Sequence, residues 1–302
     1  MEGQRVRKDI KKCQEIYRHS DYWIFCGSKF QSCRGQNGTL ITYPEIKLCI
    51  HGIAKLPNNR LLVDDAAGIL HLLDLEAGKV LRSKQLTNKR VCQTRFALSD
   101  DGNEVFCIWA RGPKWFLAKI DLPDLDCNIY DYKANMYGVQ DIVYNAPNKL
   151  LVLEVQNTVV DGKKVSQNQI TSVVLENSIC KTTIIHRWDH SSCGKYFDGR
   201  FVWEAGYCIY DLDTGKRFSL VENADTPLPP NHTALSHIYY PEYTFLQLIN
   251  GTENIFIDCK NRKIIAKYSN NPKEHIYSGI YTGCEFWIGK PDGIYTLPFP
   301  SD

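Results

Sequence analysis

The segment HRWDHSSC, residues 186 to 193, holds the densest group of side chains that could do chemistry. His186, Asp189, His190 and Cys193 are all capable metal ligands. Structural zinc sites usually draw two ligand pairs from separate elements, and no second Cys or His pair stands at a matching spacing elsewhere. The sequence therefore favours His186 as the end of a strand, with Asp189 and His190 as loop residues. It leaves His186, Asp189 and His190 as the alternative metal candidates and implies no cofactor.

Motifs that would mark a catalytic centre are missing from the sequence. Asp211 and Asp213 in DLDTG resemble the start of a calcium loop, but the sixth position, which must be glycine, is Lys216. A hairpin turn explains this segment better. No GxSxG elbow, Walker loop, HExxH helix or dinucleotide glycine pattern occurs. The sequence favours a protein that is not an enzyme, without deciding the matter.

Composition narrows the partners and the compartment. The 36 Lys and Arg residues against 34 Asp and Glu leave a charge of +2, too small for the usual footprint of a nucleic-acid binder. No stretch approaches 18 apolar residues, and the first ten residues lack the apolar core of a signal peptide. We therefore expect a cytoplasmic protein that binds neither nucleic acid nor membrane. Several of the 12 cysteines, such as Cys26, Cys107 and Cys208, lie in apolar runs and are predicted to be buried free thiols.

The elements that must position these residues are short strands. Runs rich in Val, Ile, Leu and aromatic residues alternate with Gly, Pro, Asn and Asp, which is the strand signature. One turn-plus-strand unit recurs at intervals of about 38 to 51 residues, close to the repeat of a four-stranded propeller blade. Its seven strands begin near Tyr22, Arg60, Glu104, Lys149, Arg200, Thr244 and Glu285.

Two copies of one hairpin support this repeat. LLDLEAGKVL, at residues 72 to 81, returns as IYDLDTGKRF at residues 209 to 218. Gly78 and Gly215 are expected to take the positive φ that such a hairpin requires. The one exception to the strand pattern is IKKCQEIY, in which Ile10, Cys13 and Tyr17 recur at helical spacing, so a short helix is expected there.

The last copy ends one strand short of a blade, and the N-terminal segment QRVRK could supply that strand and remove an open edge. We therefore expect an all-β chain, residues 1–302, that forms a single seven-bladed propeller. Its blades are four-stranded and antiparallel, and its ring is closed by the N-terminal strand. The repeat resembles the WD40-like and YVTN-like propellers over nearly the whole chain. The WD40 pattern of Gly-His and Trp-Asp in each blade is missing, because the sole Trp-Asp, Trp188-Asp189, is expected between the fourth and fifth blades.

In such blades the loops between the second and third strands share one face with the connections between blades. Three long segments are assigned to it, 156 to 169, 186 to 194 and 221 to 233, and they are either functional loops or neutral insertions. WARGPKW joins them, with Trp109 and Trp115 as contact residues or as a stabilising cross-strand pair. Phe30 and Arg34 are expected to be exposed on the same rim. The candidate contacts are Trp109, Arg111, Lys114, Trp115, Lys163, Trp188, Phe30 and Arg34.

These observations predict a monomeric, non-catalytic scaffold that holds a protein or peptide partner on this face. The alternative is a hydrolase or lyase with a small-molecule or metal site at the central mouth of the propeller. In that case His186, Asp189 and His190 would be its first candidates. Propeller hydrolases assemble acids and histidines from different blades and leave no local motif, so the absence of such a motif does not exclude this alternative.

Overall fold

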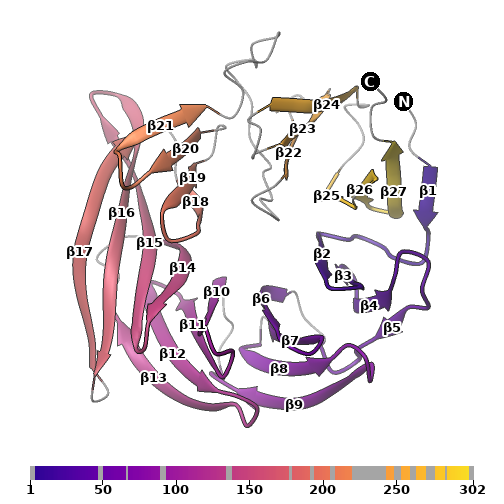
Figure 1. The fold of residues 1–302 in the computed structure, drawn as a ribbon, viewed down its shortest axis with the longest axis horizontal. Helices are drawn as coiled ribbons and strands as arrows, with labels where there is room; N and C mark the ends of the chain where they lie inside the picture. Colours follow the sequence, from indigo (N-terminus) through magenta and orange to yellow (C-terminus); the bar gives the residue numbers. More distant parts are fainter. Residues whose placement is uncertain are drawn as a thin grey trace. The chain divides into compact units, whose positions relative to one another are not determined.

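The computed structural model arranges short strands into antiparallel sheets (Figure 1). It describes residues 4–46, 50–65, 67–88, 93–133, 138–176, 179–190, 194–204, 208–219, 243–247, 253–258, 263–269, 276–282 and 284–298. Within these ranges the strands form six four-stranded sheets and one three-stranded sheet. The chain divides into two compact units. The central unit comprises residues 45–204 and 210–216, and the terminal unit comprises 1–44, 205–209 and 217–302.

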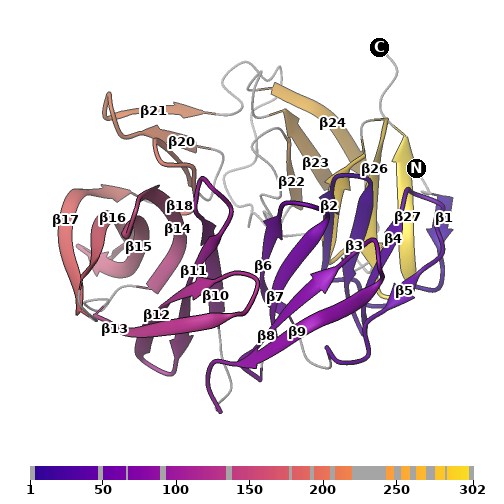
Figure 2. The same cartoon turned by 60° about the horizontal axis from the view of Figure 1, so that its bottom comes forward.

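Three sheets of the central unit keep their strands in chain order, and Figure 2 shows β6 to β9 side by side in that order. The first contains β6 (Ile50–Leu56), β7 (Arg60–Asp65), β8 (Ile69–Asp74) and β9 (Lys79–Gln85). The second contains β10 (Gln93–Leu98), β11 (Glu104–Arg111), β12 (Lys114–Asp121) and β13 (Asp126–Tyr132). The third contains β14 (Gly138–Ala146), β15 (Lys149–Val160), β16 (Lys163–Glu176) and β17 (Ile179–His190). A further four-stranded sheet contains β18 (Gly194–Phe197), β19 (Phe201–Glu204), β20 (Cys208–Asp211) and β21 (Lys216–Ser219).

The terminal unit holds two four-stranded sheets and the three-stranded one. One contains β2 (Glu15–His19), β3 (Tyr22–Cys26), β4 (Phe30–Arg34) and β5 (Ile41–Thr42). Another has the order β25 (Ser278–Tyr281), β26 (Glu285–Lys290), β27 (Gly293–Pro298) and β1 (Gln4–Arg7). The three-stranded sheet contains β22 (Tyr243–Gln247), β23 (Glu253–Asp258) and β24 (Lys263–Ser269).

The N-terminal strand completes the last sheet, as the sequence predicts. β1 pairs antiparallel with β27, with Gln4 opposite Thr296 and Arg5 opposite Tyr295. This pairing covers an edge of β27 that would otherwise present unpaired N–H and C=O groups.

The second strand of a sheet can be an unbroken apolar run because neighbouring sheets pack on both of its faces, as β11 shows. β11 is buried at every position from Val105 to Ala110, and its side chains alternate between two faces. Val105 and Cys107 pack with residues of β7 and β8, whereas Phe106 and Ile108 pack with residues of β14 to β16. A strand between two other layers is apolar on both faces, unlike β13, most of which is partly or fully exposed.

Two turn predictions are confirmed. Gly78 and Gly215 have φ values of 63° and 66° and close the β8–β9 and β20–β21 hairpins. Asp74 and Asp211 brace these turns by accepting hydrogen bonds from the backbone N–H groups two residues on. The DLDTG segment is therefore a hairpin.

The predicted helix at IKKCQEIY is wrong. Ile10 and Cys13 lie in the connection between β1 and β2, and both are buried in the core that joins these two sheets. Lys12 between them has a φ of 51°, which no α-helix allows. Ile10 and Cys13 have a helix-like spacing because both side chains anchor an irregular segment in the core.

The eight cysteines among the described residues are thiols that form no disulfide. Cys26 and Cys107 are buried, and Cys208 is half-buried. Burial raises the pKa of the Cys107 thiol well above its ordinary value, so this side chain acts as an inert apolar group. The described part of the chain contains no helix long and apolar enough to span a membrane.

Candidate functional site

The strands of each four-stranded sheet are called a, b, c and d in chain order. The b–c loop and the connection that leaves strand d lie at one end of the sheet, here the b–c edge. The a–b and c–d loops lie at the opposite end, here the a–b edge.

The b–c turn of the second sheet presents two cations. Arg111 lies directly opposite Lys114 at the end of the β11–β12 hairpin, and Gly112 between them has a φ of 60°. The Arg111 guanidinium lies 5.1 Å from the centre of the Phe116 ring, which holds it against the sheet. Lys114 is exposed. Both side chains are therefore available at the b–c edge.

Trp109 and Trp115 do not form the expected cross-strand pair, because the register places Trp109 opposite Phe116 and Trp115 opposite Ala110. The two indoles thus lie on opposite faces of the sheet. Trp109 is 2% exposed and stacks on Phe116 at 5.7 Å, so it is a core residue and has no surface to offer a partner. Trp115 is half-buried opposite Tyr132 of β13.

The predicted loop at residues 156 to 169 is wrong, because these residues form a β-ribbon. β15 and β16 pair without interruption to Val160 opposite Lys163, whereas the pairing of β14 with β15 begins only at Gly138 opposite Val155. The ribbon therefore extends past its inner strand at the b–c edge (Figure 1). Asp161 and Gly162 have φ values of 49° and 74°, the two positive values of a two-residue hairpin turn. This Asp-Gly pair is the sequence signal that could have identified the ribbon.

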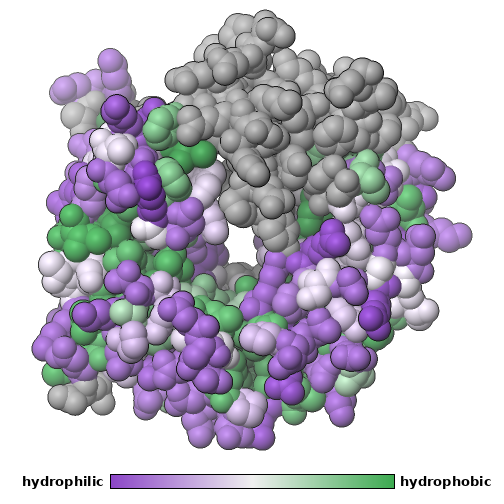
Figure 3. All heavy atoms as spheres, in the orientation of Figure 1, coloured by the Kyte–Doolittle hydropathy of each residue, from purple (hydrophilic) through white to green (hydrophobic). Residues whose placement is uncertain are grey.

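At the ribbon's tip an apolar and a basic residue stand in solvent. Val159 is 65% exposed, and Lys163 is exposed on the other side of the turn. The neighbouring strand β17 adds Ile179, Ile184 and Ile185, with exposed fractions of 57%, 46% and 53%. Hydrophobic residues are visible on the side of the surface where β17 runs (Figure 3).

A buried polar network supports the ribbon from one face. Arg187 donates to Oε1 of Gln169 at 2.7 Å, and Gln169 donates to the Glu154 carboxylate at 2.5 Å. Thr171 also donates to this carboxylate. Glu154, Gln169 and Thr171 are at most 3% exposed, so their hydrogen bonds substitute for water.

The HRWDH part of segment 186 to 194 is also strand, not loop, and the Trp-Asp pair therefore lies within the last strand of the third sheet. Trp188 is 9% exposed, stacks on Tyr210 at 4.6 Å and donates to Glu204 at 2.8 Å. This burial argues against its predicted role as a contact residue, because Trp188 is part of the core beside β20. The third long segment, 221 to 233, lies outside the described residues.

Strand geometry also separates the metal candidates. Side chains alternate along a strand, so Asp189 lies on the face opposite to His186. His186 Nε2 is 2.8 Å from the Tyr210 hydroxyl, and Asp189 accepts from Gln167 at 3.1 Å. The side chain of His190 and all of Cys193 lie outside the described residues. Among the residues described, no three His, Cys, Asp or Glu side chains come together as a metal site.

Phe30 and Arg34 lie at opposite ends of β4 and not on one rim. Phe30 begins the strand at the b–c edge and is 3% exposed, packed edge-on against Tyr43 at 5.7 Å. Its predicted exposure is wrong. Arg34 ends the strand at the a–b edge, where its side chain is 69% exposed beside Asp21.

No local sequence motif predicts the Ser-His-Asp chain of contacts in the first sheet of the central unit. His71 Nδ1 is 2.9 Å from Ser83 Oγ, and His71 Nε2 is 3.4 Å from Asp65 Oδ2. The other oxygen of Asp65 accepts from the backbone N–H groups of Ala67 and Ile69, which braces the b–c turn. Ser83 is exposed on the outer strand β9. This chain of contacts ties the three strands β7, β8 and β9 together.

Comparison with known proteins shows the fold alone. No protein-family model matches the chain, and no curated protein matches its sequence. Among solved structures, the computationally designed Ika8 protein, a β-propeller, superposes with a TM-score of 0.61 at 10% sequence identity. The match covers 99% of this chain and 100% of the designed one. The chain therefore has a propeller-like repeat of four-stranded antiparallel sheets, and the likeness carries no information on function.

Proposed function

We propose that the protein is a non-catalytic recognition scaffold that binds an acidic, extended segment of a protein partner. The contact surface is the b–c edge of the second and third sheets of the central unit. The observation that carries this proposal is the β15–β16 ribbon, which projects past β14 and ends in a tight turn. A surface already ordered as β-structure loses little conformational entropy on binding, unlike the flexible loop that the sequence suggests.

The charge and polarity of this edge define the partner. The β11–β12 turn contributes the cations Arg111 and Lys114, and the ribbon turn contributes Lys163 beside Asp161. Val159 supplies an exposed apolar anchor. An extended peptide with acidic residues around an apolar one matches this combination. Arg111 and Lys114 thus keep their predicted role, whereas Trp109, Trp188 and Phe30 are replaced by Val159.

Two matched double variants test this function. Arg111→Glu with Lys114→Glu reverses the charge of the b–c turn, and Arg82→Glu with Lys84→Glu reverses two exposed cations of β9, which pair with Asp124 and Asp126. Affinity capture from the source cells identifies a partner, and its affinity is then measured with purified proteins. We expect the first variant to lose about tenfold or more in affinity and the second to keep the wild-type value. Equal affinities for both variants would exclude this edge.

We also infer that the sheets close into one seven-bladed ring as a single, monomeric, cytoplasmic domain. Support comes from the six four-stranded sheets, from the three-stranded sheet at 243 to 269 and from the N-terminal strand that completes the last sheet. A crystal structure would count the blades. Sedimentation equilibrium would give the mass in solution, and a mass well above 34.7 kDa would contradict a monomer.

A further inference from the structure

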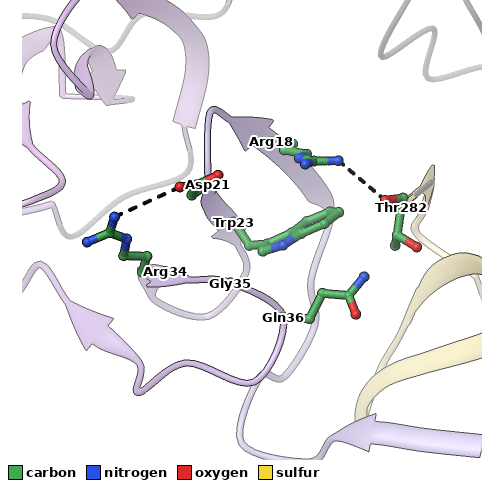
Figure 4. Close-up of a pocket in the computed structure, with 7 residues that line it drawn as sticks. All are labelled: Arg18, Asp21, Trp23, Arg34, Gly35, Gln36 and Thr282. Atoms are coloured by element: carbon green, nitrogen blue, oxygen red, sulfur yellow. Dashed lines mark hydrogen bonds and ion pairs between the residues drawn. The ribbon is translucent and has the colours of Figure 1, made fainter. Parts of the chain in front are cut away.

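The terminal unit contains a pocket of about 400 Å³ at the a–b edge of the sheet β2–β5. Its lining combines two arginines with an indole and an amide (Figure 4). We propose that this pocket binds an oxyanion, the carboxylate or phosphate group of a small molecule. This site lies in a different unit from the proposed partner surface and is independent of it. The lining residues are Arg18, Asp21, Trp23, Arg34, Gly35, Gln36 and Thr282.

One cation of the pocket is held in place by neighbouring groups. The Arg18 guanidinium lies 5.6 Å from the centre of the Trp23 ring and donates to the carbonyl oxygen of Thr282 at 3.3 Å. Figure 4 shows it above the indole. Trp23 is itself fixed, because it is 3% exposed and its ring centre is 4.7 Å from that of Trp287. A guanidinium that is already oriented loses little freedom when it binds an anion.

The second cation has donors to spare. Arg34 contacts the Asp21 carboxylate through one nitrogen at 3.9 Å, and these side chains are 69% and 72% exposed. An exposed pair at this distance contributes little energy, so an incoming oxyanion can replace it. A guanidinium carries five N–H donors and binds carboxylate and phosphate in a two-pronged geometry.

Two contacts fix the backbone on the C-terminal side of Arg34. Gly35 has a φ of 67° and donates its N–H to the Asp21 carbonyl at 2.7 Å, which ties the c–d loop to the a–b turn. A Cβ on Gly38 would lie 2.0 Å from the Arg34 carbonyl oxygen, so only glycine fits there.

Arg7 of β1 fixes the same loop from the neighbouring sheet. Its Nη1 donates to the carbonyl oxygens of Gln36 and Gly38 at 3.3 and 3.0 Å. Asp9 accepts from Nε and Nη2 of Arg7, and the Arg7 side chain is 10% exposed. Arg7 is thus a positioning residue, and within the described part of the chain the side-chain amide of Gln36 has no hydrogen-bond partner. The half-buried Gln36 amide extends from a backbone that Arg7 holds, and its N–H groups are available to a ligand.

The test is a titration of the full-length protein with inorganic phosphate and, separately, with succinate. Binding is followed by the NMR shifts of the arginine Nε–H groups and of the Gln36 side-chain amide. We expect saturation with a dissociation constant of about 1 mM or lower for at least one probe, as for a small anion held by an arginine in a two-pronged geometry. Saturation by phosphate alone assigns the site to phosphate groups, and saturation by succinate alone assigns it to carboxylates. A linear response to both would overturn the proposal.

Two variants with opposite expected effects make the test specific. Arg34→Gln should weaken binding about tenfold, because it removes a charged donor. Asp21→Asn should strengthen it several-fold, because it removes the carboxylate that competes for Arg34. Arg82→Gln, an exposed arginine paired with Asp124 in the central unit, is the matched control and should leave the constant unchanged. Equal constants for Arg34→Gln and Arg82→Gln would place the anion elsewhere.

Discussion

At the scale of single residues, burial decides which groups keep a surface role. Trp109, Trp188 and Phe30 have the types that mark binding hot spots, yet each is under 10% exposed. The same burial perturbs acids at the sheet ends. The Asp64 side chain is fully buried, Oδ2 accepts from Thr94, and Oδ1 has no hydrogen-bond partner among the described residues. Desolvation raises the pKa of this carboxyl from 3.8 to about 7.

This raised pKa predicts a stability that depends on pH. The folded protein holds the Asp64 proton up to about pH 7, whereas the unfolded chain releases it near 3.8. The stability contribution is therefore complete below about pH 4 and is lost as the pH rises through 7. Asp64→Asn removes this titration. We expect its free energy of unfolding, from urea denaturation at about pH 4 and pH 8, to fall less over this interval than that of the wild type, by on the order of 2 kcal/mol. Parallel pH profiles would contradict the burial argument.

A second residue-scale prediction separates core from contact. Trp188→Phe keeps an aromatic ring beside Tyr210 but removes the N–H that Glu204 accepts. We expect a loss of about 1 to 3 kcal/mol in unfolding free energy, because a buried carboxylate oxygen loses its donor. Affinity for the partner should stay within twofold of wild type. A loss of affinity without a loss of stability would restore Trp188 as a contact residue.

At the scale of elements, the β15–β16 ribbon is the part of the central unit that sheet packing does not require. Its last pairs, from Asn157 opposite Ser166 to Val160 opposite Lys163, lie beyond the end of β14. The hydrogen bond from Ser166 to Asn157 at 2.8 Å marks where the ribbon can be cut without breaking the network around Glu154.

We predict that shortening the ribbon separates binding from folding. Replacement of residues 159–164 with Asn-Gly joins the Thr158–Val165 pair, which has the same hydrogen-bonding phase as Val160–Lys163, by a two-residue turn. The melting temperature should fall by less than about 4 °C, which corresponds to roughly 1 kcal/mol in a domain of this size. Partner affinity should fall at least tenfold, because Val159 and Lys163 are removed. Calorimetry measures both quantities, and unchanged affinity would exclude the ribbon from the contact surface.

At the scale of the whole molecule, strands from the two ends of the sequence lie in one sheet. β1 supplies the outer strand of the sheet that ends the chain, and its Arg7 reaches the loop at Gln36 and Gly38. The N-terminal strand thus contributes to an edge of one sheet and to the pocket of another.

Deletion of residues 1–8 should therefore have two consequences. Loss of β1 exposes the edge of β27, so we expect a lower melting temperature and concentration-dependent association. Loss of Arg7 frees the pocket loop, so phosphate or succinate binding should weaken. Light scattering with a thermal melt measures the first effect, and the NMR titration measures the second. A truncated protein that stays monomeric and equally stable would contradict the role of β1.

By itself the sequence determined the local structure of most of the chain. Alternating apolar runs, turn residues at Gly78 and Gly215 and a regular repeat sufficed for the four-stranded sheets and for the strand that completes the last one. These features follow from short-range backbone and side-chain preferences, which the sequence states directly. The sequence also contains the Asp-Gly turn of the ribbon, but the length of the segment from 156 to 169 led to the prediction of a loop.

Only the tertiary structure decided which residues face solvent and which meet. A Trp at a hairpin end can lie on either face, and one residue of register places Trp109 in the core opposite Phe116. Phe30 and Arg34 are four residues apart, yet strand length puts them at opposite edges of one sheet. The pocket joins Arg18, Arg34 and Thr282 from distant parts of the chain. Such contacts arise from how sheets pack on one another, and no local pattern records them.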